Sequence, residues 1–163
     1  MSLREDLQAA LRGRVAVVGI GNPDLGDDAA GVRLAEALAA RGLPDVLAAE
    51  RTPEHWAGQL MHGRFDSILL LDAVDAGLPA GDVLLMDATR IQARFPQIST
   101  HRLSLGLLAR LLEGQGTGRV RLLGIQPASL APGAGLSPAV RATVHLLTDL
   151  LRSLLTPHAG PGP

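Results

Sequence analysis

The chain has 163 residues, a length typical of one domain with a sizeable core. Apolar residues make up 47% of it and aromatic residues only 2%, so we expect a core of Leu, Val, Ala and Ile. The net charge of −1 gives no basic footprint for nucleic acid or membrane surfaces. The absence of cysteine excludes disulfides, thiolate metal sites and a cysteine nucleophile.

The amino-terminal segment MSLREDLQ contains Glu5 and Asp6 and has no apolar run, so it does not have the pattern of a signal peptide. The longest apolar run, Ile68–Leu71, is far too short to span a bilayer. We therefore expect a cytoplasmic protein. No apolar stripe is left over once the predicted helices are packed, so we also expect a monomer that binds neither nucleic acid nor membrane.

Periodicity and turn residues predict alternating helices and strands. In chain order these are a helix over Leu3–Leu11 with a Ser2/Glu5 capping box, a strand over Arg14–Ile20, a helix from about Ala29 to Gly42, a strand over Asp45–Glu50, and a helix opened by Thr52-Pro53 that holds Trp56 and Leu60. There follow strands over Ser67–Asp72 and Gly81–Asp87, the second near a sheet edge, a helix from Ser99 or Thr100 to about Glu113, a strand over Arg119–Ile125, and a last helix opened by Ser137-Pro138.

This alternation is typical of a mostly parallel sheet that is covered by helices on both faces. We expect a single three-layer α/β/α domain over residues 1–156 with a mostly parallel five-stranded sheet. The last segment, residues 157–163, is expected to be a disordered tail.

Ligands of such folds bind beyond the carboxyl ends of the strands. Asp28 follows the first predicted strand, Asp72 ends the third, and His101 lies at a helix start after the fourth. Two carboxylates and an imidazole suit Zn, Ni, Mn or Fe(II) with open coordination positions. The set is one ligand short of a closed structural site, so the residues alone indicate a metal-linked hydrolase or a metal binder.

Each of these residues also has an ordinary structural interpretation. Asp27 or Asp28 is expected to cap the helix that follows, Asp72 suits a turn, and His101 suits an exposed first helical turn. The chain has neither a zinc-protease helix motif nor a serine nucleophile elbow, which argues against those two mechanisms.

A nucleotide-binding module is a further alternative, because Gly19 and Gly21 follow a buried strand and Glu50 ends the next one. However, Asp24 occupies the third glycine position of the dinucleotide fingerprint, and the acids around it would repel phosphate.

Five segments, in order, resemble the maturation endopeptidases of nickel–iron hydrogenases. They are Gly19-x-Gly21-Asn22 with Asp27-Asp28-Ala-Ala-Gly31, Thr52-Pro53-Glu54 as in the formate-hydrogenlyase-type members, Leu71-Asp72-Ala73, Ser99-Thr100-His101, and Gly124-Ile125-Gln126-Pro127. The resemblance extends from about Val15 to Leu155.

The resemblance implies an endopeptidase that clips the C-terminal extension from a hydrogenase large-subunit precursor after nickel insertion. It implies that Asp28, Asp72 and His101 are both the catalytic and the metal-contacting residues, with either carboxylate as base for a water, an aspartic-type activity. Nickel would then be borne by the substrate and transient, with zinc or cadmium as a surrogate in the isolated protein. A resident-metal amidohydrolase or aminopeptidase on a related α/β fold stays open as the alternative.

Overall fold

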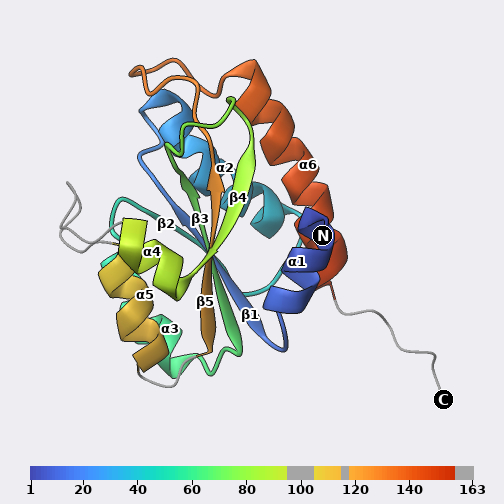
Figure 1. Ribbon diagram of the computed structural model, residues 1–163, viewed down its shortest axis with the longest axis vertical. Helices are drawn as coiled ribbons and strands as arrows, with labels where there is room; N and C mark the ends of the chain where they lie inside the picture. The colour runs from blue at the N-terminus through green and yellow to red at the C-terminus, as the bar shows by residue number, and fades with distance from the viewer. Residues whose placement is uncertain (95–104, 115–117, 157–163) are drawn as a thin grey trace.

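The computed structural model describes residues 1–94, 105–114 and 118–156, which build a twisted five-stranded sheet (Figure 1). The strands are β1 (Val15–Ile20), β2 (Val46–Glu50), β3 (Ser67–Ala73), β4 (Val83–Asp87) and β5 (Arg119–Ile125), in the order β2-β1-β3-β5-β4. All neighbouring pairs are parallel except β4 and β5, which are antiparallel. The predicted fold class is therefore confirmed, as is the edge position of the fourth strand.

Helices cover both faces of the sheet, as predicted. The longer helices are α1 (Leu3–Ala10), α2 (Ala30–Ala40), α3 (Ala57–His62), α4 (Ala88–Arg94), α5 (Leu105–Gly114) and α6 (Pro138–Leu155), and two short 3-10 helices are η1 (Gly26–Ala29) and η2 (Pro53–Trp56). Figure 1 shows α1, α2 and α6 on one side of the sheet and α3, α4 and α5 on the other. The two apolar clusters follow the same division.

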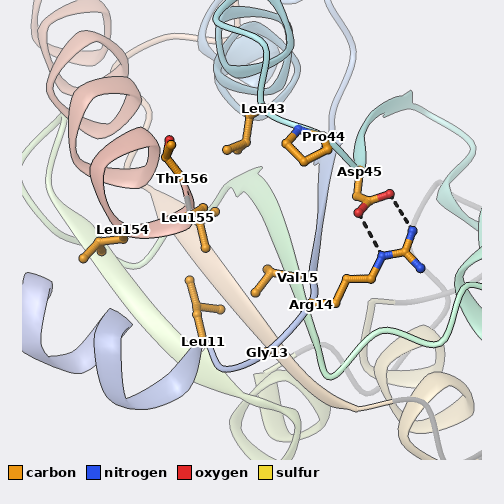
Figure 2. Close-up of a pocket in the computed structure, with 10 residues that line it drawn as sticks. All are labelled: Leu11, Gly13, Arg14, Val15, Leu43, Pro44, Asp45, Leu154, Leu155 and Thr156. Atoms are coloured by element: carbon orange, nitrogen blue, oxygen red, sulfur yellow. Dashed lines mark hydrogen bonds and ion pairs between the residues drawn. The ribbon is translucent and has the colours of Figure 1, made fainter. Parts of the chain in front are cut away.

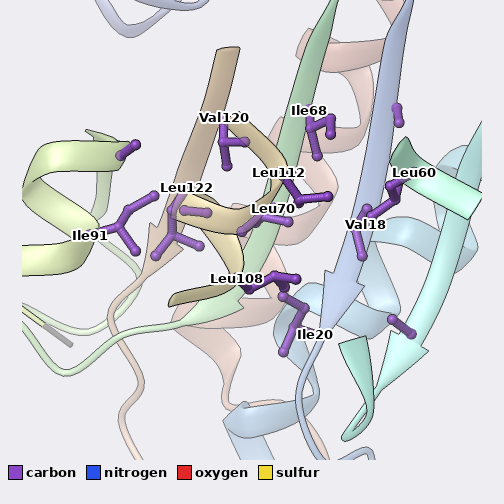
Figure 3. Packing of buried hydrophobic residues seen from close by; sticks show 14 of the residues in the cluster. Val18, Ile20, Leu60, Ile68, Leu70, Ile91, Leu108, Leu112, Val120 and Leu122 are labelled. Carbon is purple, nitrogen blue, oxygen red and sulfur yellow. The ribbon is translucent and has the colours of Figure 1, made fainter. Parts of the chain in front are cut away.

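The core is aliphatic on both faces, because successive residues of each buried strand point to opposite sides. On the α3–α5 side the packed residues include Val18, Ile20, Leu60, Ile68, Leu70, Ile91, Leu108, Leu112, Val120 and Leu122 (Figure 3). The low aromatic content is thus compensated by close packing of branched side chains.

The capping box predicted at the first helix is present. The Ser2 hydroxyl accepts a hydrogen bond from the Glu5 backbone N–H, and the Glu5 carboxylate accepts one from the Ser2 N–H. The helix starts predicted at Thr52-Pro53 and Ser137-Pro138 are also confirmed, although neither Thr52 nor Ser137 makes a side-chain capping bond to its own helix. The Ser137 hydroxyl is instead engaged by an acid from another part of the chain.

Helix α4 was not predicted. It buries only Ala88 and Ile91, which is too short a stripe to register as helical periodicity. Its start is capped by Asp87, whose carboxylate accepts a hydrogen bond from the Arg90 N–H. The start of the helix predicted from Ser99 or Thr100 lies outside the described residues, as does the predicted tail, and α5 is described from Leu105.

No helix in the described parts of the chain combines the length and apolarity needed to cross a membrane.

Candidate functional site

Glycines bring the start of α2 against the ends of two strands. A Cβ on Gly31 would lie 2.2 Å from the carbonyl oxygen of Leu71 in β3 and 2.7 Å from that of Ile20 in β1. Both distances are shorter than real Cβ contacts, so only glycine allows this approach. The acidic turn just before α2 is thereby held at the carboxyl edge of the sheet.

Asp28 and Asp72 both lie next to Gly21. Gly21 has a φ of 135°, and a Cβ there would lie 1.9 Å from the backbone oxygen of Asp28 and 3.7 Å from Oδ1 of Asp72. The Asp28 carboxylate accepts a hydrogen bond of 2.8 Å from the Asn22 N–H. The structure thus brings two of the three predicted site residues together.

The Asp72 carboxyl group is disposed to hold a proton. Burial raises the pKa of Asp72 well above its ordinary value, the negative charge of Asp28 raises it further, and a hydrogen bond from the Ala73 N–H opposes both effects. A carboxyl pair of this kind can share a proton between unequal partners or bind a cation.

Asp27 has a different role from Asp28. It is fully buried, and its carboxylate accepts hydrogen bonds from the backbone N–H groups of Ala128, Ser129 and Ser137 and from the Ser137 hydroxyl. Burial alone would raise the pKa of Asp27, but these hydrogen bonds outweigh it and lower the pKa overall. Asp27 therefore joins the turn after β1 to the loop after β5, whereas the sequence suggested a cap for the helix that follows it.

His101 lies outside the described residues. The sequence argument placed it at the site edge because a helix follows the fourth strand, yet β4 is antiparallel and its carboxyl end lies at the opposite edge. The unpredicted α4 lies between, and Arg94 at its end donates a hydrogen bond to the backbone oxygen of Asp75, three residues after Asp72. Arg94 is the last described residue before the segment that contains His101.

Metal ligation is not decided by the described part of the chain. Within residues 1–94, 105–114 and 118–156, no three His, Cys, Asp or Glu side chains group closely enough to hold a metal ion. Ligation by Asp28, Asp72 and His101 therefore stays a prediction.

Two residues of the resembling segments have contacts that sequence reasoning did not foresee. Oε2 of Glu54 in η2 is buried and, among the described residues, has no hydrogen-bond partner. Gln126 is buried just after β5, and its side chain binds the loop that follows β3. The only sequence signal for either residue was its place in one of those segments.

A pocket lies at the opposite edge of the sheet, where β1 begins (Figure 2). It is lined by Leu11, Gly13, Arg14, Val15, Leu43, Pro44, Asp45, Leu154, Leu155 and Thr156. Figure 2 shows the Arg14 guanidinium paired with both oxygens of the Asp45 carboxylate, at 2.9 and 3.0 Å. Neither Asp28 nor Asp72 lines this pocket, so we do not place the chemistry there.

Comparison with known proteins identifies the protein as a peptidase. The sequence model of a family described as hydrogenase maturation protease matches residues 32–153. The chain belongs to the hydrogenase maturation protease family.

Individual relatives agree with this assignment. The chain is 34% identical over 140 residues to the hydrogenase 2 maturation protease of Escherichia coli K12, covering 81% of this chain and 84% of the relative. It is 36% identical over 110 residues to the hydrogenase 3 maturation protease of the same strain, covering 66% and 69%. The structure resembles that of a NiFe hydrogenase maturation protease from Thermococcus kodakarensis KOD1, with a TM-score of 0.82, 28% identity, and 93% of this chain and 99% of the other covered.

Proposed function

We propose that this protein removes the C-terminal extension of a nickel–iron hydrogenase large-subunit precursor, and that it does so only after nickel has been inserted. Family membership supports the peptidase activity, and the E. coli relatives are named for hydrogenase 2 and hydrogenase 3. The observation that carries the proposal is the proximity of Asp28 and Asp72 beside Gly21, where the charge of Asp28 acts on the Asp72 carboxyl group. The C-terminal region of the precursor is the partner.

Nickel acts here as part of the substrate. Asp28, Asp72 and His101 would contact the nickel that the precursor carries, while the precursor supplies the remaining ligands. A nearby cation favours the charged form of a carboxyl group, so nickel would offset the effects of burial and of Asp28, which raise the pKa of Asp72. Zinc or cadmium would occupy the same position loosely in the isolated protein.

The chemistry is hydrolysis of one peptide bond. Water attacks the scissile carbonyl carbon, the C–N bond breaks, and the leaving amine takes up a proton. The substrate-borne metal would polarise the carbonyl or activate the water, and Asp28 or Asp72 would accept the proton of that water. In this sense the activity is aspartic-type, and we propose that it is exerted by a monomer in the cytoplasm.

A processing assay tests the proposal. A large-subunit precursor, with and without nickel, is mixed with the protein and followed by gel and mass spectrometry. The expected result is loss of a C-terminal peptide from the nickel-loaded form only. Asp28→Asn, Asp72→Asn and His101→Ala should each abolish the cleavage, whereas Asp24→Asn, a change of an exposed acid in the same turn, should not.

Three outcomes would count against the proposal. Equal cleavage of both precursor forms would contradict the dependence on nickel, and full activity of Asp72→Asn would contradict the carboxylate pair. No cleavage of several precursor types would favour the resident-metal amidohydrolase instead. Metal analysis of protein purified without chelator would then be expected to find a stoichiometric ion.

A further inference from the structure

Gln126 occupies a central place beside the end of β3. It follows β5 directly, and β5 is the strand that pairs with β3 next to Asp72 and Ala73. Only 6% of its surface is exposed. A buried amide is costly unless its donors and acceptors are paired, so its partners are informative.

The side chain of Gln126 uses both of its ends on one loop. Its Oε1 accepts hydrogen bonds from the Ala76 N–H at 2.7 Å and the Leu78 N–H at 3.1 Å. Its Nε2 donates to Oδ1 of Asp75 at 3.1 Å and to the backbone oxygen of Pro127 at 3.3 Å. Three of these four hydrogen bonds therefore involve residues 75, 76 and 78, a few residues after Asp72.

The backbone around Gln126 holds both ends of the same loop. The Val74 N–H donates to the oxygen of Ile125 at 2.9 Å. At the far end, the Gly81 N–H donates to the backbone oxygen of Gln126, and the Gln126 backbone N–H donates to the backbone oxygen of Asp82. The loop is therefore fixed at its start, middle and end by residues 125 and 126.

One of these contacts is charge-assisted, the hydrogen bond from Gln126 to the Asp75 carboxylate. Asp75 bonds Gln126 and also accepts a hydrogen bond from the Gly77 N–H, and its backbone oxygen is bonded by Arg94. The Asp75 carboxylate can only accept, so the group facing it from position 126 has to be a donor. Glutamine supplies that donor and an acceptor for the loop amides at once.

We propose that Gln126 is a positioning residue for the candidate site: by fixing the loop over residues 74–82 it fixes the place of the Asp72 carboxylate. Asp72 lies only two residues before that loop, so a displacement of the loop is transmitted to it through a short piece of strand. Misplacement of a reacting group by a small distance lowers the rate of the chemical step more than it weakens substrate binding. The inference rests on the proposed function, because its kinetic test uses cleavage of the precursor.

A swap of donor and acceptor tests this role. Gln126→Glu keeps an acceptor for the loop amides but sets two carboxylates against each other, and kcat is expected to fall by about tenfold or more while KM stays within about threefold. Asp75→Asn alone keeps an acceptor for Gln126 and for Gly77, so its kcat should stay near that of the wild type. The double variant Gln126→Glu/Asp75→Asn restores one donor facing one acceptor, so kcat should recover to within about threefold of the wild type.

Ser67→Ala is the matched control. Ser67 is buried at the other end of β3, where its hydroxyl donates to the Arg12 oxygen and accepts from the Arg12 N–H. This variant loses buried hydrogen bonds on the same strand but far from Asp72, so it should lower the unfolding midpoint and leave kcat unchanged. All kinetics are measured at a temperature at which every variant is folded.

The outcomes distinguish the positioning role of Gln126 from the proposed function. If the wild type cleaves the precursor and Gln126→Glu cleaves it equally fast, the positioning role is wrong and the proposed function stands. The positioning role is also wrong if Ser67→Ala loses as much kcat, or if the double variant does not recover. If the wild type cleaves no precursor, both fall together. Should Gln126→Glu fail to fold, Gln126→Asn, uncharged and one methylene shorter, is held to the same kcat and KM criteria.

Discussion

Asp27 and Ser137 are 110 residues apart in the chain and are joined by two hydrogen bonds. The Ser137 N–H donates to Oδ1 of Asp27 at 2.7 Å, and the Ser137 hydroxyl donates to Oδ2 at 2.8 Å. Because Asp27 directly precedes Asp28, this link ties the acidic turn to the start of α6. The position of Asp28 therefore depends on a helix that lies far from it in sequence.

Replacing Asp27 should destabilise the fold strongly. Asp27→Asn puts an NH₂ group among four donors, so we expect the free energy of unfolding to fall by about 3 kcal/mol. Urea denaturation measures this value. Asp24→Asn, in the same turn but exposed, should change it by less than about 0.5 kcal/mol, and equal effects of the two variants would refute the prediction.

The contribution of Asp27 should also depend on pH. Its pKa is lowered in the folded protein, so the folded state binds fewer protons and the stabilisation is fully present above the unfolded-chain pKa of about 3.9. It is lost as the pH falls through the lower folded-state pKa. The stability difference between wild type and Asp27→Asn should therefore shrink on acidification, and a difference that stays constant down to about pH 2.5 would contradict this linkage.

Asp72→Asn should gain stability while it loses cleavage. The folded-state pKa of Asp72 is raised, so the charged form is disfavoured by folding, and the cost grows as the pH rises from the unfolded-chain pKa toward the folded-state pKa. The amide carries no charge and avoids this cost. We expect a higher thermal midpoint than the wild type at neutral pH. Near pH 3 we expect no gain, because this pH lies below the ordinary Asp pKa of about 3.9 and the carboxyl group is then protonated in both the folded and the unfolded protein. A lower midpoint at neutral pH would mean that Asp72 has a stabilising partner.

Gly21→Ala should damage the site directly. The added methyl group would collide with the backbone oxygen of Asp28, and the φ of 135° is strained for any L side chain. We expect cleavage of the precursor to fall by more than about tenfold, with a loss of stability of about 2 kcal/mol or more. The control is Gly58→Ala in α3, where the methyl group meets nothing within 4 Å and should be neutral or slightly stabilising.

Glu54→Gln should not destabilise the protein. Oε2 of Glu54 is buried and has no hydrogen-bond partner within residues 1–94, 105–114 and 118–156, and an unpaired buried charge is unfavourable. Neutralising it is expected to raise the free energy of unfolding by about 1 kcal/mol, measured by urea denaturation. Glu36→Gln, which removes an equal charge from an exposed pair with Arg33, serves as the control. A loss of stability in Glu54→Gln alone would show that the carboxylate is needed by the fold.

The buried strands could be read from the sequence because their signal is local. β5 has the predicted bounds, Arg119–Ile125, and β1 begins one residue later than predicted. The direction of β4 was not predicted, although residues 74–82 hold turn residues and no helix. Two parallel strands need a crossover connection of a dozen or more residues, so this short loop without a helix already argued against a parallel β4.

The site was predictable only in part, since its partners are distant in sequence. Asp27 and Asp28 are adjacent acids, and nothing local distinguishes the structural one from the one beside Gly21. The distinction is made by Ser137 and by the loop after β5, more than 100 residues away. The same holds for Gln126, whose partners 48 and 50 residues upstream come into reach only through the pairing of β3 with β5.

The place of β5 in the sheet has a consequence for the order in which the protein can become active. β5 lies between β3 and β4, although both precede it in the chain, so it has to insert between two strands that leave the ribosome earlier. Gln126 and the residues that bind Asp27 all follow β5 in the sequence. A nascent chain therefore holds its acidic turn and its β3 loop without their anchors until the residues after β5 have emerged. The acidic turn and the β3 loop can therefore take up their final hydrogen bonds only in a late step of folding.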